Sequence, residues 1–184
     1  MSLVHGTEAP SSWVCRWTSL LRPGAQVLDL ACGAGRHMKY LSQQGHQLLG
    51  VDRSEEALTA ASAWGSTLQA DIENGPWPLE GQQFDAVVVT NYLWRPLWSR
   101  ITGSVGMGGA LLYETFAQGH ETVGRPSRQD FLLAPAELLQ IASQAGLRVV
   151  AYEDGFVQAP DRFVQRIAAV RETASASPPR WRLD

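Results

Sequence analysis

Basic residues are few in this sequence and do not cluster. Lys39 is the single lysine, no run of Lys and Arg occurs, and the net charge is −3. Proteins dedicated to nucleic-acid binding usually carry a basic face, so the composition disfavours nucleic acid as a partner. A compact basic patch assembled from scattered arginines stays open as an alternative.

Cysteines and long apolar runs are also scarce. Two cysteines, Cys15 and Cys32, are too few for a disulfide framework or a four-thiolate metal site, and we expect Cys32 to be a small buried thiol. No apolar stretch reaches the roughly 18 residues that a membrane span needs. The N-terminal stretch MSLVHGTEAPSSW lacks the cationic start and apolar run of a signal peptide. These absences predict a cytoplasmic protein with no metal and no membrane partner.

Hydrophobic residues make up 45% of the 184 residues, which is enough for a core. The length predicts one domain, which we place at residues 1–172. The last residues, 173–184, are small and polar with two prolines, and they predict a flexible tail.

Apolar runs alternate with helical patterns along the chain. Strands are predicted at 25–31, 46–52, 66–72, 84–91 and 108–116, helices at 35–45, 54–64, 97–105 and 134–146, and an antiparallel strand pair at 147–157 and 162–172. Strands separated by helices indicate an α/β fold, in which a parallel sheet carries helices on both faces. Ligands of such sheets bind at the carboxyl ends of the strands.

A glycine turn, LDLACGAGRH, follows the first predicted strand. The triphosphate-binding pattern GxxxxGK[ST] is absent from the chain. In the dinucleotide pattern GxGxxG, Gly33 and Gly35 fit, but Met38 takes the third position and is too bulky for close contact between helix and strand. Asp29 precedes the turn and would repel a pyrophosphate. A phosphate ligand is therefore disfavoured, and an NAD-linked oxidoreductase is the weaker alternative.

Three strand ends carry carboxylates, namely Asp29, Asp52 and Asp71. Asp29 can attract an ammonium group, and Asp71 can accept a hydrogen bond from an exocyclic amine. Asp52 follows Gly33 by nineteen residues, close to the spacing of about 20 expected for an acid that binds ribose. Backbone N–H groups at the following helix start can meet a carboxylate. S-adenosylmethionine combines all of these groups.

The motifs resemble those of the class I S-adenosylmethionine-dependent methyltransferases. VLDLACGAGRH resembles their motif I, GVDRS their second-strand acidic motif, QADIENGPWPL their adenine-contacting loop, FDAVVVTNYLWRP their fourth-strand motif and GGALLYETF their fifth-strand motif. The resemblance spans about residues 11–172, and the G-R after motif I also resembles the small tellurite-resistance-type members. It implies a Rossmann-like doubly wound seven-stranded sheet of order 3-2-1-4-5-7-6 with strand 7 antiparallel. It implies cofactor contacts, with S-adenosylhomocysteine as product, at Asp29, Ala31, Gly33, Gly35, Asp52, Asp71, Ile72 and Asn91.

Methyl transfer from a sulfonium is an in-line displacement that needs alignment more than acid–base chemistry, so a dedicated catalytic residue is not required. Glu114 and His120 are the candidate proton acceptors. Substrate candidates are Tyr92, Arg95 and Arg125, the last in a predicted lid over residues 117–130.

The sequence predicts a small-molecule methyltransferase. NYLW differs from the NPPY of amino-group methyltransferases that act on adenine or glutamine, and little chain extends beyond the core fold. A non-catalytic S-adenosylmethionine-binding or regulatory protein stays open as the alternative. No feature of the sequence indicates an oligomeric state or the identity of the methyl acceptor.

Overall fold

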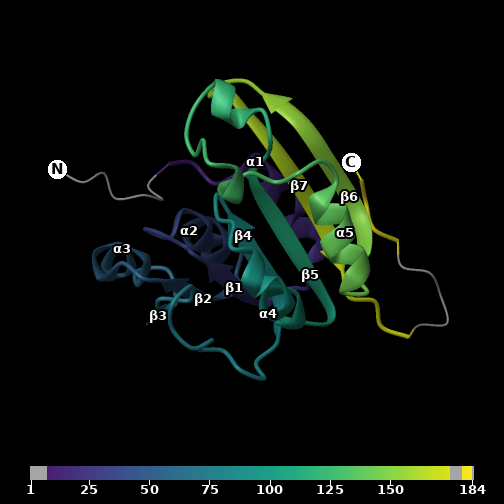
Figure 1. Cartoon of the computed structure of the whole chain (residues 1–184). Coiled ribbons are helices and arrows are strands. Elements are labelled where there is room, and N and C mark those ends of the chain that lie inside the picture. Colours follow the sequence, from purple (N-terminus) through teal and green to yellow (C-terminus); the bar gives the residue numbers. More distant parts are fainter. Residues whose placement is uncertain (1–7, 175–179, 184) are drawn as a thin grey trace.

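A computed structural model describes residues 8–174 and 180–183. Its seven strands are β1 (Gln26–Leu30), β2 (Gln47–Asp52), β3 (Ser66–Gln69), β4 (Phe84–Thr90), β5 (Val105–Phe116), β6 (Arg148–Val157) and β7 (Arg162–Val170). They form one sheet of order β3-β2-β1-β4-β5-β7-β6, in which β7 runs antiparallel to both of its neighbours (Figure 1). The predicted fold class and strand order are confirmed.

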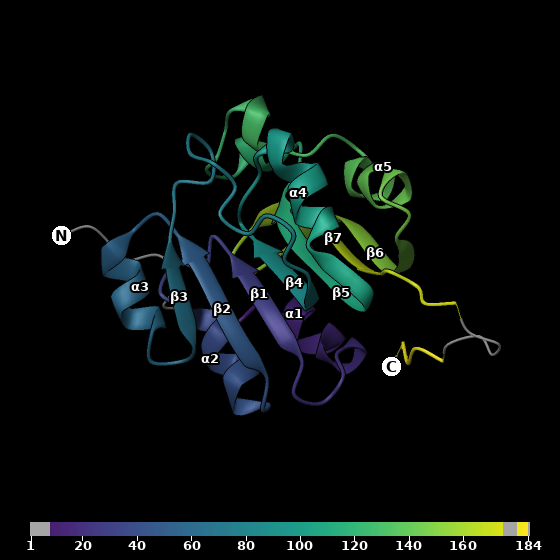
Figure 2. The same ribbon diagram turned by 90° about the horizontal axis from the view of Figure 1, so that it is seen from below.

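Helices cover both faces of this sheet (Figure 2). They are α1 (Ser12–Trp17), α2 (Arg36–Gln43), α3 (Glu55–Ala61), α4 (Trp98–Gly103) and α5 (Glu137–Gln144). Side chains of α1, α2 and α3 join one buried apolar cluster, and those of α4 and α5 join another. Because the strands are covered on both faces, the middle of β4 is a continuous buried run, as in other parallel sheets.

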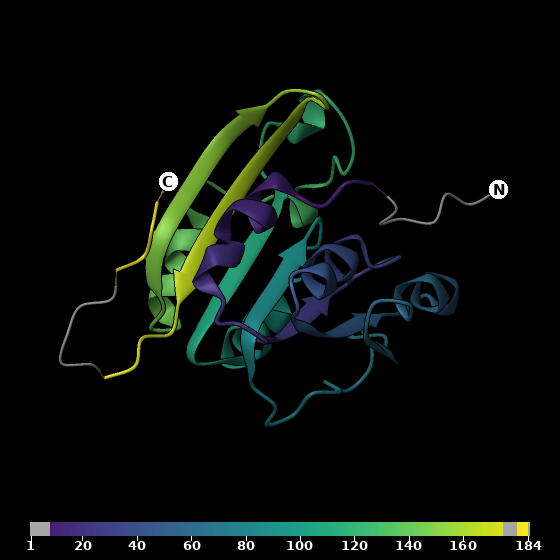
Figure 3. The same cartoon turned by 180° about the vertical axis from the view of Figure 1, so that it is seen from behind.

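Helix α1 was not among the elements predicted from the sequence. Ser11 caps it by accepting a hydrogen bond from the Trp13 N–H at 3.1 Å. The Trp13 indole N–H donates to the Ile167 carbonyl at 3.1 Å, which fixes the helix on the sheet beside β7 (Figure 3). Trp13 and Trp17 are buried, so this six-residue helix is stabilised mainly by apolar contact with the sheet.

Several predicted boundaries shift. Strand β5 begins at Val105, inside the predicted helix 97–105, and α4 already ends at Gly103. Helix α5 begins after Ala136, which adopts φ 62°, and so starts later than the predicted helix 134–146. Ser54 caps α3 by accepting a hydrogen bond from the Ala57 N–H at 3.2 Å.

Described residues of the predicted tail contact the folded part of the chain. The Arg148 guanidinium lies 4.9 Å from the centre of the Trp181 ring, and Arg16 donates to the Leu183 carbonyl at 3.0 Å. Residues 175–179 and 184 lie outside the described residues. Within the described ranges, none of the helices has both the length and the apolar character that crossing a membrane requires.

Candidate functional site

The glycine turn connects β1 to α2 at the carboxyl end of the sheet. Ala31, Gly33 and Gly35 have φ values of 54°, 56° and 80°, a left-handed region that favours glycine. A Cβ atom at Gly35 would lie 2.9 Å from the Cβ of Ala61 in α3. Gly35 is therefore needed both for the turn and for the close approach of α3.

Helix α2 packs closely on β2 in spite of Met38. The Met38 side chain is fully buried, and its sulfur occupies the space that a Cβ atom at Gly50 would fill. The small residue that permits this contact therefore lies on the strand and not on the helix. The bulk of Met38 is thus no argument against a dinucleotide, which leaves the position of Asp29 as the argument that remains.

Asp52 joins the end of β2 to the glycine turn. One of its carboxylate oxygens accepts from the Gly33 N–H at 2.9 Å, and the other accepts from the Ser54 N–H at 2.9 Å. These bonds hold the carboxylate at the mouth of the turn. Since a carboxylate offers about four acceptor positions, it still has capacity for a ligand's hydroxyl groups.

Asp71 lies just beyond β3 and stabilises its own loop. Its Oδ1 accepts from the N–H groups of Glu73 and Asn74 at 3.1 Å each, and its Oδ2 accepts from the Asn74 side chain at 2.9 Å. Hydrogen bonds from Asn74 lower the pKa of Asp71, so the group is ionised. One acceptor position on Oδ2 is left for a ligand.

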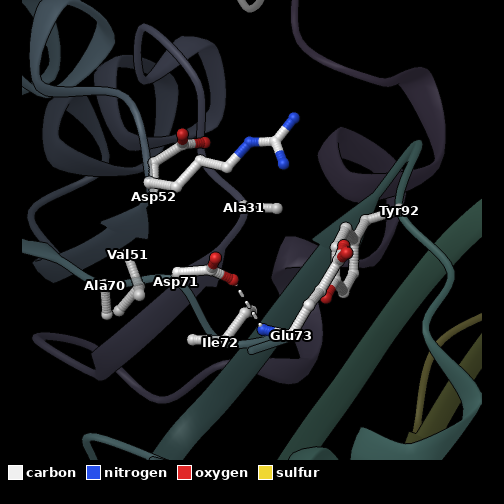
Figure 4. Close-up of a pocket in the computed structure, with 9 residues that line it drawn as sticks. Ala31, Val51, Asp52, Ala70, Asp71, Ile72, Glu73 and Tyr92 are labelled. Atoms are coloured by element: carbon white, nitrogen blue, oxygen red, sulfur yellow. Dashed lines mark hydrogen bonds between the residues drawn. The ribbon is translucent and has the colours of Figure 1, made fainter. Parts of the chain in front are cut away.

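A pocket of about 470 Å³, partly open to solvent, lies between these strand ends (Figure 4). Four predicted cofactor residues line it, namely Ala31, Asp52, Asp71 and Ile72. Tyr92, predicted as a substrate contact, lines the same pocket. The sequence prediction missed four further lining residues, all of which adjoin the acids or follow them within two positions: Val51, Arg53, Ala70 and Glu73.

The Tyr92 hydroxyl oxygen is buried and interacts with the Glu73 side chain, which lines the same pocket. Burial, followed by the charge of Glu73, raises the pKa of Tyr92. Tyr92 is therefore a neutral donor at the wall of this pocket.

Asp29 lies beneath the turn and is 1% exposed. Burial raises its pKa to about 7, although the charge of Arg36 opposes the shift. Its Oδ2 is buried and has no hydrogen-bond partner among the described residues. Such an unpaired buried oxygen is costly, which makes it a candidate ligand contact.

His37, beside Asp29, is neutral. Burial, together with the charge of Arg36, lowers the pKa of His37 to about 3. Its Nε2 accepts from the Ser11 N–H at 3.1 Å, so the ring proton sits on Nδ1, which lies 4.0 Å from Asp29 Oδ2. The contact is too long for a hydrogen bond, and a neutral ring makes no ion pair.

Asn91 follows β4 with φ 53°, and its N–H donates to the Glu114 carbonyl at 2.9 Å. The side chain of Asn91 is exposed at the strand ends, near Tyr92. Asn91 thus completes the carboxyl edge that the predicted residues share.

The two candidate proton acceptors lie in buried surroundings. Glu114 is 1% exposed, and its Oε2 lies 2.6 Å from Arg166 Nε in a salt bridge across β5 and β7. The His120 ring stacks on Phe116 with centroids 4.3 Å apart, and its Nε2 lies 3.0 Å from the Arg125 carbonyl. Neither Glu114 nor His120 lines the 470 Å³ pocket, so their catalytic roles stay predictions.

The predicted substrate arginines hold the segment after β5. Arg95 binds the Glu137 carboxylate through Nε at 2.7 Å and Nη2 at 2.9 Å. It also donates to the carbonyls of Asp130 and Leu132 at 2.7 and 2.9 Å. Arg125 precedes a cis proline, and its carbonyl meets His120. These contacts stabilise the predicted lid and its surroundings. Substrate binding by Arg95 and Arg125 stays a prediction.

The donor set suits a cationic nucleoside ligand such as S-adenosylmethionine. The pocket presents the ionised Asp71 and the available acceptor positions of Asp52, while Asp29 supplies an unpartnered buried oxygen next to the turn. The crowding at Gly35 shows that this position of the turn has no room for a side chain. Within the described residues no three His, Cys, Asp or Glu side chains are grouped as metal ligands.

Comparisons with known proteins agree with this arrangement. Residues 27–106 match the family described as "Methyltransferase domain". A Synechocystis protein described as "Uncharacterized methyltransferase sll0829" is 46% identical over 41 residues, which are 22% of this chain and 19% of that protein.

Similar solved structures cover most of the chain. TehB from Haemophilus influenzae has a TM-score of 0.73 at 21% identity, over 92% of this chain and 64% of that one. A TehB-like S-adenosylmethionine-dependent methyltransferase from Corynebacterium glutamicum has a TM-score of 0.66 at 20% identity, over 90% of each chain. Magnesium protoporphyrin IX methyltransferase from Synechocystis, solved with S-adenosylhomocysteine, has a TM-score of 0.66 at 19% identity, over 87% of this chain and 78% of that one. At these identities the likeness concerns the fold.

Proposed function

We propose that this chain is a class I S-adenosylmethionine-dependent methyltransferase that transfers a methyl group from S-adenosylmethionine to a small molecule; the match of residues 27–106 to a methyltransferase domain supports the proposal. One observation carries the proposal. Asp52 and Asp71 line one pocket at the strand ends, Asp52 also accepts from the Gly33 N–H of the glycine turn, and the buried Asp29 has an oxygen without a partner among the described residues.

Each part of the site has a distinct task in holding the cofactor. Asp52 would accept from ribose hydroxyls, and Asp71 would accept from the adenine amine with its remaining position. Ile72 and Ala31 supply apolar walls to the pocket. Asp29 would take the ammonium group, which repairs its unsatisfied oxygen.

When bound, the cofactor supplies an electrophilic methyl group on a sulfonium. The chain's own residues then need to orient the acceptor and exclude water, which are contributions of alignment. Tyr92, whose pKa is raised, stays protonated and serves as a donor and not as a base. Glu114 is engaged by Arg166, which favours acceptors that need no strong base from the protein.

The surroundings of the β4 and β5 ends support a small acceptor. On one side, the Arg36 side chain bridges the N-terminal segment at Ala9 and the end of β4 at Thr90. On the other side, residues 117–133 fold back on β5 through a hydrogen bond from the Leu133 N–H to the Phe116 carbonyl at 3.0 Å. Two segments of the chain thus border the acceptor side. A cytoplasmic setting, in which the free thiols of Cys15 and Cys32 stay reduced, is part of the proposal.

Titration calorimetry with S-adenosylhomocysteine tests cofactor binding. We expect saturable binding by the parent chain and a loss of roughly tenfold or more in Asp52→Ala, because that carboxylate is a ribose acceptor. Glu55→Ala is a matched control, since Glu55 is an exposed acid in the first turn of α3. Absence of binding by the parent chain would refute the proposal.

Turnover separates the enzyme from its alternatives. A labelled methyl group transferred to any member of a panel of small acceptors excludes the non-catalytic binding protein. If NADH displaces S-adenosylhomocysteine from the protein, the oxidoreductase is supported, and if it does not, the oxidoreductase is excluded. The position of Asp29 disfavours the oxidoreductase.

A further inference from the structure

Arg36, the first residue of α2, is nearly buried and yet loosely held. Its side chain is 12% exposed. It approaches Thr90 Oγ1 at 3.4 Å, the Ala9 carbonyl at 3.4 Å and the Glu8 carboxylate at 3.8 Å. All three distances are at or beyond the long end of hydrogen-bonding range, although a guanidinium carries five N–H donors.

Other partly buried arginines of the chain are held far more tightly. Arg95 makes contacts of 2.7 to 2.9 Å to a carboxylate and two carbonyls. Arg171 donates to three carbonyls at 2.8, 3.2 and 2.8 Å. The fold thus gives the guanidinium groups of Arg95 and Arg171 short hydrogen bonds, and the long contacts of Arg36 are specific to its own site.

Arg36 lies beside Asp29, whose pKa its charge lowers against the effect of burial. The two groups form no direct salt bridge among the described contacts, and Asp29 Oδ2 remains without a partner there. A guanidinium and a carboxyl group thus lie near each other at the glycine turn, each with unused hydrogen-bonding capacity. Thr90, the contact of Arg36, ends β4, and Tyr92 two residues later lines the pocket.

We propose that Arg36 binds the carboxylate at the amino-acid end of the cofactor, beside the Asp29 oxygen that takes the ammonium group. An α-amino acid carries both charges on one carbon, so its receptor needs an anion and a cation side by side. Arg36 is suited to this task, since a guanidinium can bind a carboxylate through two parallel hydrogen bonds. The inference rests on the proposed function and assigns a residue to one end of that site.

Calorimetry with two ligands tests the assignment. S-adenosylhomocysteine has the amino-acid end, whereas 5′-methylthioadenosine keeps the adenosine and the thioether but lacks it. Arg36→Met retains the buried aliphatic stem and removes the charge. We expect this variant to bind S-adenosylhomocysteine roughly 10- to 100-fold more weakly, as for loss of a charged hydrogen bond, and methylthioadenosine unchanged within about twofold. Arg100→Ala, at an exposed arginine paired with Glu80, should leave both affinities unchanged.

The outcomes distinguish this inference from the proposed function. If Arg36→Met binds both ligands equally more weakly, Arg36 has a structural role. If the variant binds both as tightly as the parent, Arg36 does not contact the cofactor. Either result overturns the assignment. A parent chain that binds neither ligand overturns the proposed function itself. If Arg36→Met does not fold, decarboxylated S-adenosylmethionine serves with the parent chain. It should bind roughly 10- to 100-fold more weakly than S-adenosylmethionine, and equal affinities would refute the assignment.

Discussion

Replacing Asp29 by Asn should stabilise the ligand-free protein, and more so at higher pH. The carboxyl group is 1% exposed, and burial raises its pKa to about 7 from 3.8. An acid whose pKa is raised by folding favours the folded state most at low pH. As the pH rises from about 4 to about 7, ionisation in the unfolded state progressively destabilises the folded state. Above the folded pKa this destabilisation no longer changes with pH. The Asp29→Asn substitution removes this titration and keeps the shape of the side chain.

The size of the effect follows from the two pKa values. Their difference of about 3 corresponds to about 4 kcal/mol of destabilisation above pH 7, at about 1.36 kcal/mol for each pH unit. At pH 5 the same linkage gives a destabilisation of about 1 to 2 kcal/mol. The advantage of Asp29→Asn over the parent should therefore grow by about 2 to 3 kcal/mol between pH 5 and pH 8.

Urea unfolding of both proteins at pH 5, 6.5 and 8, without cofactor, measures this difference. Other titrating groups are shared, so they cancel in the comparison, and Asp161→Asn at an exposed position serves as control. Asp29→Asn should also bind S-adenosylhomocysteine more weakly, since an amide attracts an ammonium less than a carboxylate does. A stability difference that does not change with pH would refute the account of Asp29 as a buried, strained acid.

Three further changes test the packing around the site. Gly50→Ala would push a methyl group against the Met38 sulfur and should lower the unfolding free energy by about 1 to 3 kcal/mol. Thermal melts measure this loss. The control Gly155→Ala should show none, because a Cβ atom at Gly155 meets open space. Arg95→Ala removes the clamp on residues 130–132 and should raise amide exchange and proteolysis there, and unchanged protection would contradict a holding role. Glu114→Gln should cost about 3 kcal/mol by breaking the buried pair with Arg166. A stable but inactive Glu114→Gln variant would instead support its predicted role as a proton acceptor.

The order of the sheet could be predicted because each strand has a local signature. Buried strands such as β4 are continuous apolar runs, and capping residues such as Ser54 mark helix starts. The start of β5 at Val105 was not predicted, since the strand was placed at 108–116 and its first residues contain three glycines, which are rare in strands. At Gly109 a Cβ atom would lie 2.8 Å from the Phe84 carbonyl, so this glycine permits close approach of β4 within an irregular strand pair. That constraint comes from a neighbouring strand and leaves no local pattern.

The acids of the site were predictable for a similar reason. Asp52 and Asp71 lie at or just after strand ends, and parallel topology alone brings such positions to one edge. The direction of the Tyr92 side chain depends on the left-handed backbone conformation of Asn91, which was not predicted from the sequence. Glu73 carried a weak signal only, its position two residues after Asp71 in the same loop.

The burial of Arg36 and His37 arises from the N-terminal segment. Ala9 and Ser11 contact these residues across sequence separations of 27 and 26 positions, so nothing near the glycine turn indicates it. The same contacts give the segment a role in the site. Ser11 keeps the His37 ring in one tautomer, with its N–H toward Asp29. The Ala9 carbonyl accepts only a long hydrogen bond of 3.4 Å from Arg36. A carboxylate is a stronger acceptor than a carbonyl, so a carboxylate bound by Arg36 would replace the Ala9 carbonyl, whereas the Ser11 contact goes to His37 and does not depend on Arg36.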